Sequence, residues 1–228
     1  MMDTLKYNAT TLEKFTADKK MLYFPGVTIV YNFTDPELIK AITEIVRAYK
    51  KSRFAAKLVF LPEDSFHMTI ASIIAYKKKY QDRSLSDFPA LDKDLEETDS
   101  FIVNALRDEE ELDVEMVIER FTESKIIIKP RTPRDERVLK DYRKRIYRKL
   151  GIGYDDDYLF HISVSYTLID FDEADEREMQ ALNARLLPIY APMIGTIHID
   201  AAQLSFFNDM SEFRHHTQGR DRLGVCGF

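Results

Sequence analysis

The sequence predicts an α+β fold made of two similar lobes related by an approximate twofold axis. A five-residue pattern of aromatic, histidine, aliphatic, hydroxyl and aliphatic residues occurs twice, at residues 66–70 (FHMTI) and 160–164 (FHISV). The stretches before each copy alternate strand-like and helix-like patterns in the same order. A weak repeat of this kind predicts two related structural units.

Size and composition indicate a folded chain with a sizeable core. The 228 residues are 45% hydrophobic and 12% aromatic, which is typical of a globular protein. We expect one domain over residues 1–228, with approximate lobes 1–112 and 113–228 between which the chain can cross.

Cys226 is the single cysteine, so neither an intramolecular disulfide nor a cysteine metal cluster can form. With no basic segment leading into an apolar one at the start and no run near the ~18 apolar residues of a membrane span, we expect a cytoplasmic protein.

The charge limits the possible partners. A formal net charge of −6 argues against a general nucleic-acid binder, because such proteins neutralise many phosphates and are usually basic. The charge is uneven, however. Residues 129–149 contain ten Lys or Arg, whereas residues 108–115 and 170–178 are acidic. The basic run has two interpretations: the solvated face of a helix, which is the more frequent case, or a patch that attracts an anionic substrate.

The first predicted lobe begins with a strand over residues 27–33, which are rich in β-branched and aromatic side chains and follow a Pro-Gly turn. Asp35 and Pro36 then predict a helix start, because the carboxylate can accept from free first-turn amides and proline has no amide to lose there. Apolar residues recur at helical spacing as far as residue 51. Two further strands are predicted, over 57–61 and over 65–74, and the second carries His67.

The second predicted lobe repeats this order after a mostly charged region at residues 76–115, in which one helix begins near Pro89. The predicted elements are strands at 114–121 and 125–129, a basic helix at 134–150, and a strand at 158–169 that carries His161. The tail predicts a helix over 172–190 that is ended by Pro188 and Pro192 or is kinked by Pro188. Closing strands at 196–199 and 203–207 and a final loop complete the chain.

The duplicated motif places an imidazole beside a hydroxyl, because a strand sends residues i and i+2 to the same face. His67 is thereby paired with Thr69, and His161 with Ser163. A lone histidine in an apolar strand is more often a core residue than a catalyst, but two in equivalent positions favour function. In-line cleavage of a phosphodiester needs a base on one side of phosphorus and an acid on the other. Histidines with an unperturbed pKa of ~6.5 suit both tasks, and the hydroxyls would donate to the non-bridging oxygens.

The sequence resembles the 2H phosphoesterase superfamily, which includes the LigT-type RNA cyclic phosphodiesterases, in its paired His-hydrophobic-Thr/Ser-hydrophobic motifs at 67–70 and 161–164. More narrowly, residues 24–28 (FPGVT) and 61–66 (LPEDSF) resemble a little-characterised branch known mainly as a domain of unknown function. The resemblance implies a bilobal 2H phosphoesterase-like fold, with two pseudo-twofold-related antiparallel sheets flanked by helices and a central cleft.

The resemblance also implies metal-independent hydrolysis of a 2′,3′-cyclic phosphate or of a 2′-5′-linked nucleotide or RNA end. It assigns general acid and base roles to His67 and His161, and phosphate binding to Thr69 and Ser163, with no cofactor and no metal. The sequence differs from the best-known members in having the acidic region 76–115 and in using Ser163 instead of a second threonine. Added loops usually decide what enters a cleft. We expect a nucleotide or short RNA substrate, no membrane contact and no obligate protein partner.

Six further residues are candidates for substrate binding. Thr28 follows the Pro-Gly turn and would line the cleft, and Arg131 would supply positive potential at its mouth. Ser165 continues the inward face of its strand, where it either meets substrate or bonds locally. Three tyrosines can stack a base, although such residues more often lie in the core or on the surface: Tyr31, Tyr76 and Tyr166. His198, by contrast, is followed two residues later by Asp200 instead of a hydroxyl, and we assign it a structural role.

Two other functions compete with hydrolysis by two histidines. A nucleotide-binding protein of the same fold would hold its ligand without turnover, and its binding would survive replacement of either histidine by alanine. A metal-dependent hydrolase would use His67 and His161 as ligands, but each strand offers a hydroxyl where a metal site needs another imidazole or carboxylate. Turnover that strong chelation leaves unchanged would exclude the metal enzyme.

Overall fold

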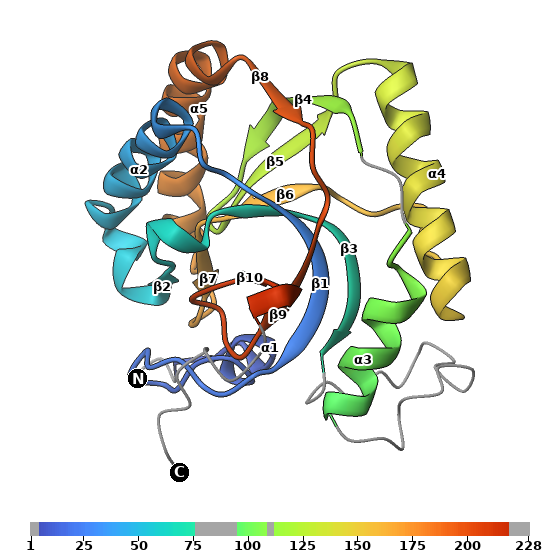
Figure 1. The fold of residues 1–228 in the computed structure, drawn as a ribbon. Helices are drawn as coiled ribbons and strands as arrows, with labels where there is room; N and C mark the ends of the chain where they lie inside the picture. The colour runs from blue at the N-terminus through green and yellow to red at the C-terminus, as the bar shows by residue number, and fades with distance from the viewer. Residues whose placement is uncertain (1–4, 76–94, 109–111, 219–228) are drawn as a thin grey trace.

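In the part of the chain that the structure describes, helices flank an eight-stranded sheet (Figure 1). The computed structural model describes residues 5–75, 95–108 and 112–218. The strands are β1 (Gly26–Asn32), β2 (Leu58–Phe60), β3 (His67–Ala75), β4 (Val114–Phe121), β5 (Lys125–Pro130), β6 (His161–Ser163), β7 (Ser165–Thr167), β8 (Thr196–Ile199), β9 (Gln203–Phe207) and β10 (Arg214–His215). The helices are α1 (Ala9–Leu12), α2 (Pro36–Lys50), α3 (Leu95–Ala105), α4 (Pro133–Leu150) and α5 (Glu173–Ile194).

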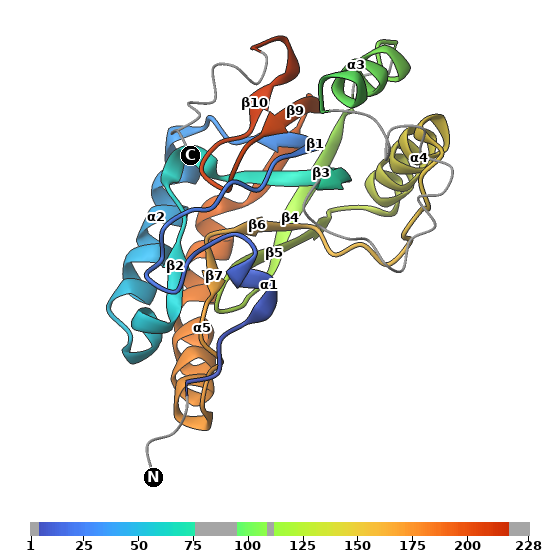
Figure 2. The ribbon, with the colours of Figure 1, turned by 90° about the horizontal axis from the view of Figure 1, so that it is seen from below.

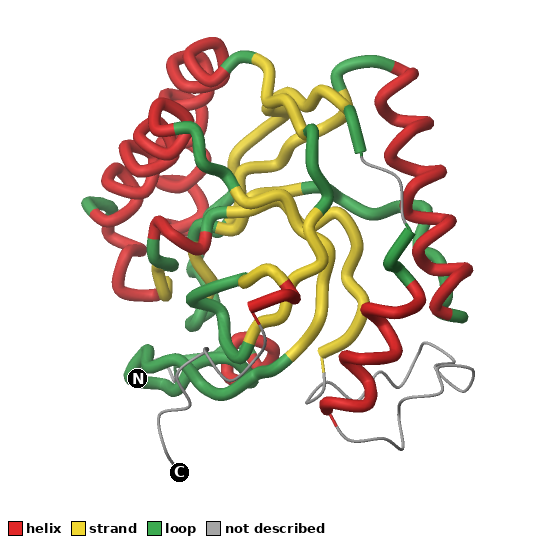
Figure 3. Tube along the Cα trace, viewed as in Figure 1, coloured by secondary structure: helices red, strands yellow, loops and turns green. Residues whose placement is uncertain are grey.

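The strands of the large sheet follow the order β10-β9-β1-β3-β6-β5-β4-β8, and β2 and β7 form a separate pair. All these pairings are antiparallel. Helices α2 and α5 lie on one side of the molecule, and α3 and α4 lie on the other (Figure 1, Figure 3). The view from below shows the same division (Figure 2). The predicted α+β class, with antiparallel strands and flanking helices, is confirmed.

The strand-helix-strand repeat is present in the structure. In the first half, β1 leads through α2 to β3, and β1 pairs with β3. In the second half, β5 leads through α4 to β6, and β5 pairs with β6. The two halves meet where β3 pairs with β6 through Met68 and Ile162. The two sheets expected from the sequence are therefore joined at the two histidine strands into one continuous sheet.

Local chemistry explains where the two repeated helices begin and end. The Asp35 side chain accepts from the amide of Glu37 at 2.9 Å, and Pro36 occupies the first helical turn, as the sequence predicts. Helix α4 begins with a capping box in which Thr132 and Asp135 bind each other's backbone amides. It ends at Gly151, whose φ of 66° is in the left-handed region that glycine enters without a Cβ clash.

Alternation along β3 and β6 separates the core from the motif's polar side chains. Met68, Ile70, Ile162 and Val164 are fully buried and belong to the main hydrophobic core. The histidine and hydroxyl of each motif occupy the intervening positions and therefore face the opposite side of the sheet. Burial of the aliphatic face thus fixes the direction in which the polar face points.

Two predicted elements differ in the structure. The strand expected over 158–169 is divided into β6 and β7, because the amides of Val164 and Ser165 both donate to the Ser124 carbonyl and β7 then pairs with β2. Helix α5 does not end at Pro188 but continues through Pro188 and Pro192 to Ile194. It packs against α2 and β4. The predicted start of a helix near Pro89 and the final loop lie outside the described residues.

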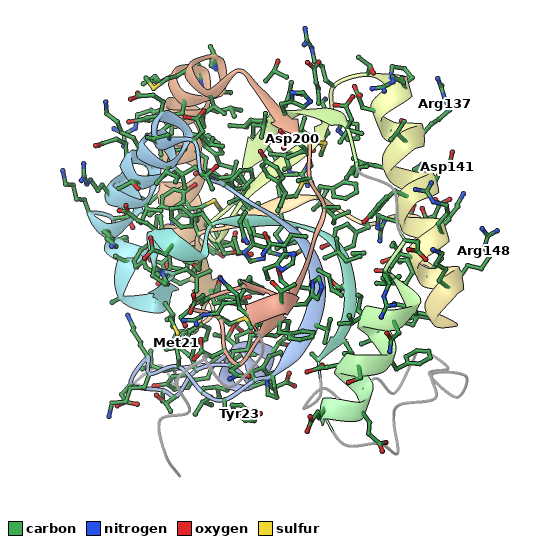
Figure 4. The ribbon with its side chains drawn as sticks, viewed as in Figure 1. Met21, Tyr23, Arg137, Asp141, Arg148 and Asp200 are labelled. Carbon is green, nitrogen blue, oxygen red and sulfur yellow. The ribbon has the colours of Figure 1, made fainter. Side chains whose placement is uncertain are left out.

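The basic helix presents most of its charge to solvent. Arg137, Asp141 and Arg148 point outward from α4 (Figure 4). Arg143 instead lies inside, 1% exposed. Within the described residues, no helix is both long and apolar enough to cross a bilayer.

Candidate active site

One cavity of about 290 Å³ brings the two copies of the motif together. Its lining includes all four motif side chains: His67, Thr69, His161 and Ser163. Because β3 and β6 run antiparallel about the pair Met68 and Ile162, His67 lies across from Ser163, and Thr69 lies across from His161. The cavity therefore holds two imidazole-hydroxyl pairs in a diagonal arrangement.

Both imidazoles are oriented by the same backbone contact. The His67 Nδ1 lies 2.7 Å from the Ser65 carbonyl oxygen, and the His161 Nδ1 lies 2.8 Å from the Leu159 carbonyl oxygen. A carbonyl oxygen only accepts, so each Nδ1 carries the hydrogen and donates it. In the neutral ring this leaves each Nε2 with a free lone pair.

Burial keeps both imidazoles neutral in the ligand-free protein. It lowers the pKa of His67 to about 4, the Ser65 carbonyl opposes this shift, and the charge of His161 adds to it. The pKa of His161 is also lowered to about 4, first by burial and next by the positive charge of Lys125, against the opposing effect of the Leu159 carbonyl. A bound anion would oppose both shifts, because negative charge favours the imidazolium form.

Tyr158 is a cavity residue that the sequence analysis did not single out. Burial raises the pKa of its hydroxyl to about 12, and the neighbouring Ser72 and Thr69 side chains oppose this shift. Its ring stacks on His161 with 6.4 Å between centroids, and the Arg143 guanidinium carbon lies 4.3 Å from the Tyr158 ring centroid. Tyr158 thus contacts one motif residue from each half. The short distance in sequence to His161 is the signal that could have indicated it.

Phe213 covers the other histidine. It lies between β9 and β10, and its ring centroid is 3.9 Å from that of His67. His67 is consequently only 8% exposed. Nothing in the local sequence around Phe213 predicts this contact, because the turn that carries it is distant in sequence from β3.

Lys14 also lines the cavity, and the sequence analysis gave no prediction for its segment. Its Nζ lies 3.3 Å from the Tyr166 hydroxyl oxygen and 4.5 Å from the Tyr166 ring centroid. Lys125 pairs with Ser163 across neighbouring strands, so the two side chains are on the same face of the sheet. Two lysines therefore stand at the His161 end of the cavity.

The cavity contains two of the six further candidates. Thr28 and Tyr166 both line it, and the Thr28 hydroxyl donates to the Ala71 carbonyl at 3.1 Å. The other described candidates lie elsewhere: Tyr31 packs edge-on against Phe33, Ser165 donates to the Glu123 carbonyl at 3.1 Å, and Arg131 pairs with Glu115 at 2.7 Å on the surface. Tyr76 lies outside the described residues.

Ser165 is turned away because the chain breaks its alternation after Ser163 to join the small sheet. His198 lies on the surface with its Nε2 2.7 Å from Asp113, and it is absent from the described lining of the cavity. Among the described residues, no group of three or more His, Cys, Asp or Glu side chains is placed to hold a metal ion.

Comparison with known proteins places the chain in a family. The family model named 2H-phosphodiest, described as a domain of unknown function (DUF1868), matches residues 14–127, which include the first histidine motif. A crystal structure of a conserved protein of unknown function from Agrobacterium tumefaciens str. C58 is similar, with a TM-score of 0.82 and 21% sequence identity over 92% of each chain. At this identity the similarity shows a shared fold. None of the curated proteins matches the sequence. The chain therefore belongs to the 2H-phosphodiest family, a 2H phosphoesterase-type family whose function is described as unknown.

Proposed function

We propose that the protein is a metal-independent phosphodiesterase that hydrolyses a 2′,3′-cyclic phosphate or a 2′-5′-linked nucleotide or RNA end. The family suggests chemistry of the phosphodiesterase type. One observation carries the finer proposal: two imidazoles with free Nε2 atoms and two hydroxyls line the same cavity. Neither half alone supplies both an acid and a base.

The proposed reaction is an in-line displacement at phosphorus. One neutral imidazole takes a proton from water through Nε2 as the water oxygen bonds to phosphorus. The other imidazole, protonated, gives its Nε2 proton to the departing ribose oxygen as the bond from phosphorus to that oxygen breaks. Thr69 and Ser163 donate to the non-bridging oxygens, where negative charge is held. A cyclic phosphate is thereby converted to a phosphomonoester with one free ribose hydroxyl.

Substrate binding supports the protonation state that the reaction needs. Both imidazoles have a pKa of about 4 in the ligand-free protein, so a general acid is scarce at neutral pH. A phosphodiester between the rings carries one negative charge, which raises the pKa of the neighbouring imidazoles. We therefore expect the bell-shaped pH profile of kcat to lie at higher pH than that of kcat/KM, because the second profile reports the free enzyme.

A nucleotide-binding protein without turnover is the second candidate. The observation that favours it is the neutrality of both imidazoles at pH 7, combined with an aromatic lining that includes Phe24, Tyr158 and Phe213. Such a cavity can stack a base and hold a phosphate without transferring a proton. Binding that persists in histidine variants, with no product from the parent protein, would favour this candidate.

The decisive experiment is a screen of the purified protein in EDTA against 2′,3′-cyclic nucleotides and 2′-5′ dinucleotides. We expect turnover, and we expect His67→Ala and His161→Ala each to lower it by ~10²–10⁴-fold, the usual contribution of a general acid or base. His198→Ala is the matched control, since this histidine is exposed and paired with Asp113. A His67→Ala protein that matches the parent in rate would remove the basis of the proposal.

A further inference from the structure

The N-terminal segment brings a positive charge to the cavity from outside the two repeated halves. The segment is fastened to the body by the Thr11 hydroxyl, which donates to the Thr167 carbonyl at 2.7 Å, and by the Asn8 amide, which donates to the Leu168 carbonyl at 2.9 Å. Lys14 follows this anchor and lines the cavity together with His161. Its ammonium group is therefore held at the cavity wall by a fixed stretch of backbone.

The Lys14 ammonium has more N–H donors than its contact with Tyr166 uses. An ammonium has three N–H donors, and Tyr166 accepts one of them at 3.3 Å while its own hydroxyl donates to the sulfur of Met210 at 3.2 Å. The Lys14 Nζ lies 5.3 Å from the Phe24 ring centroid and 4.5 Å from the Tyr166 ring centroid. Within the described residues, Lys14 forms no ion pair with a carboxylate. Burial lowers its pKa to about 8, against the opposing effect of Glu13.

Lys125 adds a second charge at the same end. Its strand partner is Ser163, and its pKa is lowered by burial, raised by Glu123 and lowered again by Lys14. The equivalent position in the first half, opposite Thr69, is occupied by Val30. The positive charge is thus concentrated at the His161 end, whereas the His67 end is covered by Phe213.

Resting on the proposed function, we propose that Lys14 binds a second anionic group of the substrate, a phosphate monoester separate from the phosphodiester that reacts. The substrate class is then a small nucleotide with two phosphates, one at the ribose 2′ and 3′ oxygens and one at the opposite end. Lys125 reinforces the potential at this subsite. A cavity of about 290 Å³ is near the lower limit of the usual range for small-molecule sites, which suits a small nucleotide.

The position of Lys14 favours a second group over the reacting phosphate itself. The reacting phosphate is expected between the imidazoles, beside Thr69 and Ser163. Of the four influences on the pKa of His161, that of Lys14 is the weakest. The charged group that acts on the pKa of His67 is His161. The Lys14 ammonium contacts the Phe24 and Tyr166 rings, so at the His161 end of the cavity it lies beside these two aromatic side chains.

Calorimetric titration with two stable nucleotides tests the proposal without requiring turnover. Adenosine 2′-monophosphate carries only the phosphate expected at the histidines, and adenosine 2′,5′-bisphosphate adds the second phosphate. We expect the parent protein to bind the bisphosphate roughly 10- to 100-fold more tightly, as charge-assisted hydrogen bonds commonly give. Lys14→Met should abolish this preference and leave the Kd for the monophosphate almost unchanged.

Two variants serve as controls. Lys14→Arg keeps the charge and should retain most of the preference. Lys20→Met removes a lysine from the same N-terminal segment, but that side chain is exposed and paired with Asp18 at 2.9 Å, so the preference should persist. Circular dichroism of each variant verifies that the fold is intact.

The outcomes separate the subsite from the proposed hydrolysis. Equal affinity of the parent protein for both nucleotides, or binding of neither, would overturn the subsite. An equal loss for both nucleotides in Lys14→Met would also overturn it, since Lys14 would then hold the phosphate at the histidines. A Lys14-dependent preference for the bisphosphate without turnover of any cyclic nucleotide would uphold the subsite and reject the hydrolysis.

Discussion

The two halves of the molecule carry the same motif in different surroundings. In each half the imidazole Nδ1 donates to the carbonyl two residues earlier, at Ser65 or at Leu159, with nearly the same distance. His67 is nevertheless buried under Phe213, whereas His161 is only half-buried. The strand motif therefore conserves the direction of Nε2 in both halves, while residues outside the motif decide how each ring is covered.

The residues opposite the hydroxyls differ in charge as well. Thr69 pairs with Val30 in the first half, and Ser163 pairs with Lys125 in the second. A displacement at phosphorus is itself asymmetric, because one side receives an oxygen and the other loses one. Two halves with equivalent motifs and unequal charge around them are well suited to such a reaction. Variants in each half can show which features are equivalent and which are not.

After loss of a histidine, removal of either motif hydroxyl should have the largest effect. We predict that Thr69→Val and Ser163→Ala each lower kcat for a 2′,3′-cyclic nucleotide by roughly 10²-fold, because each removes one donor to charge that develops on phosphate. Ser205→Ala is a control, since Ser205 is fully buried in β9 and is absent from the described cavity lining. Steady-state kinetics measures the effect. A loss seen for only one of the two motif hydroxyls would show that the halves do not share the phosphate.

The pH dependence of the free energy of unfolding should reveal the lowered pKa that the two histidines share. Both have a folded pKa of about 4 against an unfolded value of ~6.5. Between these values the unfolded chain binds more protons, so the free energy of unfolding falls as the pH is lowered from 6.5 to 4, and this histidine effect is complete below that window. We expect each histidine to contribute on the order of 1–3 kcal/mol to the decrease.

Urea unfolding across this pH window, for the parent and for His67→Gln and His161→Gln, measures the contribution of each ring. Glutamine does not titrate, so each variant should show a shallower pH dependence than the parent. The Asp172 carboxyl, with its pKa lowered to about 2 chiefly by the backbone amide of Asp175, acts mostly below this window. Equal slopes in all three proteins would mean that the imidazoles are not desolvated as described.

The sequence predicts the features of the site that are local. The alternation in residues 66–70 and 160–164 determines which side chains share a face, and Asp35 with Pro36 determines a helix start. These patterns depend only on strand geometry and on the chemistry of the first helical turn. The four motif residues were consequently identified together, and the structure brings them to one cavity.

The parts that the sequence did not predict depend on contacts between distant segments. Ser165 leaves the cavity face because Ser124, about forty residues away, accepts the amides of Val164 and Ser165. Lys14 and Phe213 reach the cavity from the two ends of the described chain. No periodicity marks such residues, since tertiary packing alone decides where their side chains end up.

The smallest expected effect concerns the electrostatic difference between the halves. We predict that Lys125→Met raises the pKa of His161 by roughly half to one pKa unit and leaves that of His67 nearly unchanged, because a positive charge beside one ring is removed. Nuclear magnetic resonance titration of the two imidazole Cε1 protons measures both values in one sample.

Phe213→Ala provides the mirror-image variant. It uncovers His67, whose pKa is lowered mainly by burial, and should raise the pKa of that ring while leaving His161 unaffected. Each variant therefore serves as the control for the other. If Lys125→Met raised both pKa values equally, its charge would act on the whole cavity, and the asymmetry on which a separate anion subsite at the His161 end depends would be lost. A rise in pKa confined to His161 would instead show that the two halves orient their imidazoles alike but differ in the charge placed around them.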